Sequence, residues 1–85
     1  MTTTVTVEFT GDLPPAPFAA FAAHRAARLS VVHEVVAQDA GRAVIRLTGA
    51  AALVEAFEMA LSLGPAECLV RDVRRLETAS GGGAR

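Results

Sequence analysis

The chain has 85 residues, which suits one domain whose large apolar side chains must all serve a single core. Its formal net charge is −1, and because it contains no lysine, its eight basic residues are all arginines. Scattered arginines without Trp or Tyr argue against a nucleic-acid surface, and the lack of a lysine amine excludes Schiff-base chemistry.

The single cysteine, Cys68, can form neither an internal disulfide nor a multi-thiolate metal site, which favours a reducing compartment. The segment MTTTVTV lacks the basic region and apolar run of a signal peptide, and no apolar stretch reaches membrane-spanning length. We therefore expect a cytoplasmic protein that contacts neither membrane nor nucleic acid and uses no cofactor or metal.

The first third of the chain predicts a strand followed by a helix. In TVTVEFT, Val5, Val7 and Phe9 alternate with polar residues, as in a strand with one buried face. Apolar residues then recur at helical spacing over residues 17–29, and Pro17 suits a first helical turn because its missing N–H needs no partner there. The predicted buried face of this helix carries Phe18, Phe21, Ala22, Ala26 and Leu29.

The rest of the chain predicts a hairpin, a second helix and a last strand. Residues 30–38 and 42–48 form two strand-like segments around a turn at 39–41. Residues 50–63 have helical periodicity that ends at Gly64-Pro65, and residues 68–76 form a charged strand. The predicted buried face of the second helix carries Leu53, Phe57, Ala60 and Leu61.

The resulting order, βαββαβ, predicts an α+β fold of the ferredoxin-like class. This is a two-layer sandwich with a four-stranded antiparallel sheet and two helices on one face. Right-handed crossovers place the first and third strands at the centre and the second and fourth at the edges. We expect one domain over residues 1–78 and a flexible, glycine-rich tail over residues 79–85.

Several landmarks in this pattern resemble the acylphosphatase family over residues 5–76. They are Gly11 after the first strand, Phe18 and Phe21 in the first helix, Gly41-Arg42 at the hairpin, Gly49 before the second helix, and LGPAECLVRDV at 63–73. The resemblance implies an acylphosphatase-like βαββαβ fold. Members of that family hydrolyse carboxyl phosphates without a metal.

The functional signature of that family is largely missing from this sequence. The signature, Gly-x-Val-Gln-Gly-Val-Gly-Phe-Arg, holds phosphate with backbone N–H groups and its final arginine, while an asparagine at the end of the second strand orients water. Ala19 stands in the place of the arginine, and Ala37 in that of the asparagine. The equivalent of the phosphate loop, which we call the proline loop, consists of Gly11, Asp12, Leu13, Pro14, Pro15, Ala16, Pro17 and Phe18.

The chemistry of these replacements predicts a pseudoenzyme. Each proline removes one backbone N–H, Asp12 adds negative charge, and alanine can neither grip phosphate nor orient water. The leading hypothesis is an acylphosphatase-like domain that has lost catalysis and serves as a non-enzymatic interaction or binding module. Two alternatives remain: a divergent acylphosphatase that uses another arginine, and a small-ligand-sensing regulatory domain.

The histidines and the cysteine predict no further site. His24 is expected to be a solvated helix residue, and His33 a partly buried, hydrogen-bonded one. Neither has a carboxylate or thiol at metal-ligand spacing. Cys68 is expected to be an inert core residue.

The predicted helix-free face of the sheet carries both arginines and valines. Arg42, Arg46 and Arg71 are expected to form cross-strand ion pairs rather than an anion site, with Arg46 and Arg71 flanking Glu8. The second strand carries valines on both faces although it lies at an edge, which favours a two-fold homodimer or an unidentified protein partner. The candidate interface residues are Val32, Glu34, Val36, Val44 and Arg46, with Leu69 near the same apolar patch.

Overall fold

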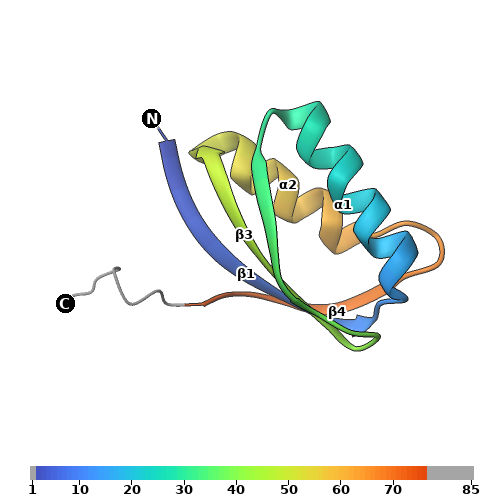
Figure 1. Cartoon of the computed structure of the whole chain (residues 1–85). Coiled ribbons are helices and arrows are strands. Elements are labelled where there is room, and N and C mark those ends of the chain that lie inside the picture. Colours follow the sequence, from blue (N-terminus) through green and yellow to red (C-terminus); the bar gives the residue numbers. More distant parts are fainter. Residues whose placement is uncertain (1, 77–85) are drawn as a thin grey trace.

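The computed structural model describes residues 2–76, which form six elements in the predicted order (Figure 1). They are β1 (Thr2–Asp12), α1 (Pro15–Leu29), β2 (Val32–Gln38), β3 (Arg42–Ala50), α2 (Ala51–Leu63) and β4 (Leu69–Leu76). The predicted tail, residues 79–85, lies outside the described residues. Neither described helix is long and apolar enough to cross a membrane.

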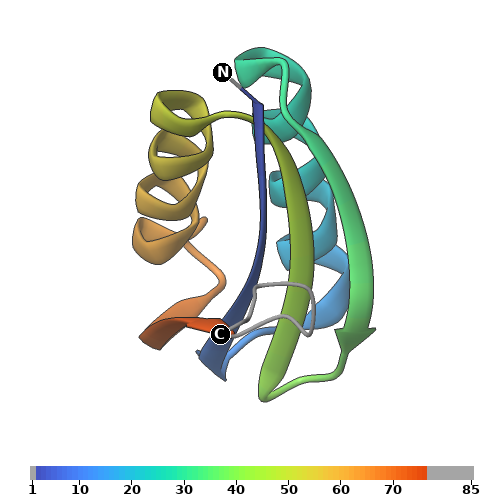
Figure 2. The ribbon, with the colours of Figure 1, turned by 90° about the vertical axis from the view of Figure 1, so that its left-hand side faces the viewer.

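The sheet is antiparallel and has the strand order β2-β3-β1-β4, as the sequence predicts. Both helices cover one face of this sheet (Figure 1), while β2 and β4 lie at its opposite edges (Figure 2). The ferredoxin-like βαββαβ sandwich predicted from the sequence is therefore confirmed.

The core lies between the sheet and the two helices. Phe9 of β1 and Phe18 of α1 meet edge to face, with ring centroids 5.7 Å apart, and this contact fixes the start of α1 on the central strand. The other main core side chains are Val7, Leu13, Ala22, Ala26, Val31, Ala43, Ile45, Leu47, Val54, Phe57 and Leu61.

Two details of the helices differ from the predictions. α1 begins at Pro15, two residues before the predicted start, because the fixed backbone angle of proline suits a first turn and Pro14 occupies the N-cap. In α2, Val54 is fully buried whereas Leu53 is 37% exposed. The prediction for Leu53 is wrong because Phe57 and Leu61 fix the rotation of the helix, and Val54 shares their face.

The predicted apolar patch on the helix-free face is also smaller than expected. Val44 is buried, because it lies on a central strand with Glu8 and Ala37 as its cross-strand neighbours and Arg42 and Arg46 on either side along β3. The expectation that Val44 contributes an exposed interface residue is therefore wrong.

Candidate functional site

The proline loop lies beside the turn between β2 and β3, at one end of the molecule (Figure 1). The Gly11 N–H donates to the Gly41 carbonyl at 3.1 Å, and the Leu13 N–H donates to the Ala40 carbonyl at 2.7 Å. Two backbone donors of the loop are thus occupied by the hairpin turn and do not converge on an open space.

The rest of the loop offers few donors. Pro14, Pro15 and Pro17 have no N–H, and the Phe18 N–H donates to the Pro14 carbonyl at 3.1 Å as the helix starts. Ala16 supplies the one N–H between Leu13 and Phe18 that makes no hydrogen bond to the described backbone. A single amide is a weak anion site compared with a set of converging ones.

The two alanines that replace family side chains lie at the same end of the fold. Ala19 is in α1 just after the loop, and Ala37 is an exposed residue near the end of β2. The neighbouring Gln38, which the sequence analysis missed, donates from Nε2 to the Pro15 carbonyl at 3.0 Å. The side-chain amide of Gln38 is therefore bonded to the loop itself, and no spacing in the sequence reveals this contact.

The one charged residue of the proline loop is a carboxylate, Asp12. Asp12 is exposed and pairs with Arg71 of β4 at 3.4 Å. Such an exposed pair contributes little stability, and it engages Arg71 with the carboxylate of the loop.

Gly11 and Phe18, the two residues that match the family signature, both have structural roles. Gly11 has a φ of 149° at a bulge in β1, and a Cβ atom there would lie 2.0 Å from the Leu69 carbonyl oxygen. Phe18 is fully buried against Phe9. These matches are explained by packing and do not require a bound anion.

The arginines of the sheet form ion pairs, as predicted, but some partners differ. Glu8 accepts a hydrogen bond from Arg42 and lies 3.4 Å from Arg74, whereas Arg46 pairs with Glu34 at 2.7 Å. The prediction that Arg46 and Arg71 flank Glu8 is wrong, because the observed register and the bulge at Gly11 set Arg74 opposite Glu8. The Arg42 hydrogen bond, helped by the charges of Arg42 and Arg74, lowers the pKa of Glu8.

The histidines and the cysteine make no metal site within residues 2–76, where no cluster of three metal-ligating side chains occurs. His24 is exposed, and His33 is partly buried with its ring 6.5 Å from that of Phe57. The hydrogen bond predicted for His33 is not formed within the described part of the chain. Burial raises the pKa of the Cys68 thiol, which fits the predicted inert role.

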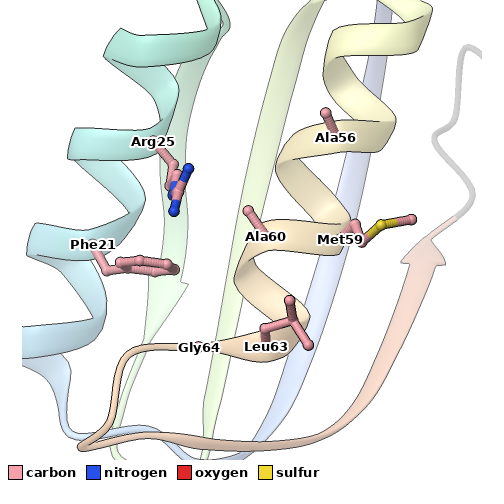
Figure 3. Close-up of a pocket in the computed structure, with 7 residues that line it drawn as sticks. All are labelled: Phe21, Arg25, Ala56, Met59, Ala60, Leu63 and Gly64. Atoms are coloured by element: carbon pink, nitrogen blue, oxygen red, sulfur yellow. The ribbon is translucent and has the colours of Figure 1, made fainter.

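A groove of about 500 Å³ lies between the two helices on their outer side (Figure 3). Phe21 and Arg25 point into it from α1, and Ala60 faces them from α2. The Arg25 guanidinium lies 5.4 Å from the centroid of the Phe21 ring, and within residues 2–76 it has no carboxylate partner. Periodicity in the sequence does not reveal this groove, because the groove depends on how far apart the two helices lie.

Comparison with solved structures finds the same architecture in acylphosphatases. The acylphosphatase from Bacillus subtilis matches with a TM-score of 0.79 and 23% identity, over 98% of this chain and 91% of that one. An acylphosphatase from Coxiella burnetii gives a TM-score of 0.80 and 18% identity, over 98% and 87% of the two chains.

A longer protein contains the same architecture as one part of its chain. Full-length HypF, in its phosphate- and nucleotide-bound form, gives a TM-score of 0.74 at 18% identity, over 94% of this chain and 11% of HypF. No family model matches the sequence, and no curated protein is significantly similar to it. The chain that carries the acylphosphatase-like landmarks therefore also has the acylphosphatase-like fold.

Proposed function

We propose that this acylphosphatase-like domain has lost phosphatase catalysis and acts as a non-enzymatic binding module. One observation carries the proposal: the backbone N–H groups of Gly11 and Leu13 in the proline loop already donate hydrogen bonds to the hairpin turn. A phosphate in this loop would have to displace those bonds and approach the carboxylate of Asp12.

The two alanines support the same conclusion. Ala19 and Ala37 offer neither a guanidinium nor an amide, and Gln38, the nearest amide, is held by the Pro15 carbonyl. Loss of one oxyanion donor typically lowers a rate by about 10² to 10³, so the combined losses would remove measurable turnover.

The direct test is hydrolysis of benzoyl phosphate, with the Bacillus subtilis acylphosphatase as the positive control. We expect the rate with this chain to equal that of buffer. The double variant Ala19→Arg, Ala37→Asn should also stay at the buffer rate, because the prolines and the occupied amides remain. Turnover by the unchanged chain would instead support a divergent acylphosphatase.

A second candidate function, recognition of a small ligand, is favoured by the groove between the helices. Its apolar lining suits the apolar body of a small molecule, and Arg25, which has no carboxylate partner among residues 2–76, suits a carboxylate on that molecule. In a thermal-shift screen of amino acids, nucleotides and octanoate, octanoate should raise Tm and octylammonium should not. Arg25→Gln should abolish the rise, and an equal rise in that variant would exclude this use of the groove.

A further inference from the structure

The two edges of the sheet differ sharply in composition. β4 has the sequence LVRDVRRL, in which half of the residues are charged, as expected of an edge that must not pair with another strand. β2 has the sequence VHEVVAQ, with one formally charged residue and no proline. β2 therefore carries few charges for a strand in an edge position (Figure 2).

The valines of β2 are exposed on both faces of the sheet. Val32 is 69% exposed, Val36 is 49% exposed, and Val35, which lies opposite Ile45 on the helix side, is 41% exposed. An ordinary edge strand has one apolar face turned to the core and one polar face turned to water. Here each face of the free edge carries an exposed valine beside its polar side chains.

The one carboxylate of β2 does not block pairing. Glu34 lies opposite Arg46 of β3 and is bonded to it at 2.7 Å, so its charge is neutralised within the chain. The bulge between Val35 and Ala37 leaves Val32–Val35 as a regular segment. This edge therefore presents backbone pairing groups flanked by valines, with no unpaired charge.

We infer that β2 pairs antiparallel with β2 of a second copy across a two-fold axis, which joins the two sheets into one. A second copy is the natural occupant because an antiparallel strand pair is self-complementary, so each edge satisfies the other. The pairing also closes, since it uses up both β2 edges and leaves only the charged β4 edges at the ends. The dimer deepens the proposed function by naming its partner and surface.

The register of the pair follows from the length of the strand and from Glu34. Val35 is the central residue of Val32–Gln38, so an axis at Val35 gives the longest overlap, in which Val32–Glu34 of each copy faces the bulged segment Val36–Gln38 of the other. An axis at Glu34 would place two carboxylates directly opposite each other, which disfavours that register. The valine at position 35 of one copy therefore faces the same valine of the other.

The test measures molar mass by sedimentation equilibrium at high micromolar concentration, for the unchanged chain and for variants that carry opposite charges at position 35. The unchanged chain should have about twice its monomer mass of 8.8 kDa. Val35→Lys and Val35→Glu should each weaken association by about tenfold or more, because like charges then meet across the axis. An equimolar mixture of the two variants should recover the dimer mass, because opposite charges now meet.

The matched control is Leu69→Lys, which adds the same charge at an exposed apolar residue of the β4 edge and should leave the dimer intact. Cooperative urea unfolding checks that each variant is folded, and Val35→Arg or Val35→Asp replaces a position-35 variant of the same charge that is not. A monomeric unchanged chain, or folded variants whose mixture stays monomeric, would overturn the inference. The benzoyl phosphate assay is independent, since an active dimer would contradict only the loss of catalysis.

Discussion

Glu8 is the residue around which the charges of the helix-free face are arranged. Its carboxylate is mostly buried and is shared by Arg42 and Arg74, while Asp12 and Glu34 each pair with one arginine. The hydrogen bond from Arg42 outweighs the cost of burial and lowers the pKa of Glu8. The deprotonated form is therefore favoured by folding.

This lowered pKa predicts a dependence of stability on pH. The contribution of Glu8 is fully present above its unfolded pKa and is lost as the pH falls through its folded pKa. Glu8→Gln should therefore lower the free energy of unfolding at neutral pH, and the difference from the unchanged chain should vanish in acid. Urea unfolding at several pH values measures this. Asp12→Asn, at an exposed pair, should change stability little at any pH.

At the scale of single elements, α2 shows how the packing partner decides which side chains are buried. Leu53 and Leu61 both fit the apolar periodicity of the helix, yet Leu61 is fully buried and Leu53 is partly exposed. Val54 takes the place expected for Leu53, because its side chain lies on the same side as Phe57. The helix is apolar on more than one side, so periodicity alone leaves its rotation open.

The rotation of α2 can be checked with two leucine truncations. Leu61→Ala should lower the free energy of unfolding by about 2 to 5 kcal/mol, since it leaves a cavity in the core. Leu53→Ala, the same chemical change at a side chain that is 37% exposed, should cost less than about 1 kcal/mol. Guanidinium unfolding measures both, and equal losses would show that the helix is rotated from the orientation described here.

At the scale of the whole molecule, the sequence predicts the order and layers of the fold because strand and helix periods are local properties. The alternation in β1, the helical spacing in α1 and the turn between β2 and β3 each involve residues that are close together in the sequence. Handed crossovers then determine the strand order. These steps need no knowledge of distant contacts.

The parts that the sequence does not predict depend on contacts between distant segments. The burial of Val44 and the partners of Glu8 follow from the register of all four strands, and two bulges shift that register. For the candidate site, the sequence alone shows that the arginine and the asparagine of the family are missing. The bonds from Gly11 and Leu13 to the hairpin turn cannot be read from the sequence, because they join segments about 30 residues apart.

The contact between Gly11 and Leu69 has a consequence for how related sequences are interpreted. A chain that keeps this strand crossing must keep a residue without a side chain at that place, whatever reaction it performs or has abandoned. Scoring this glycine, or the aromatic ring at position 18, as a surviving fragment of an active-site motif would mistake architecture for reactivity. Only the positions released from packing, such as 19 and 37, carry information about chemistry.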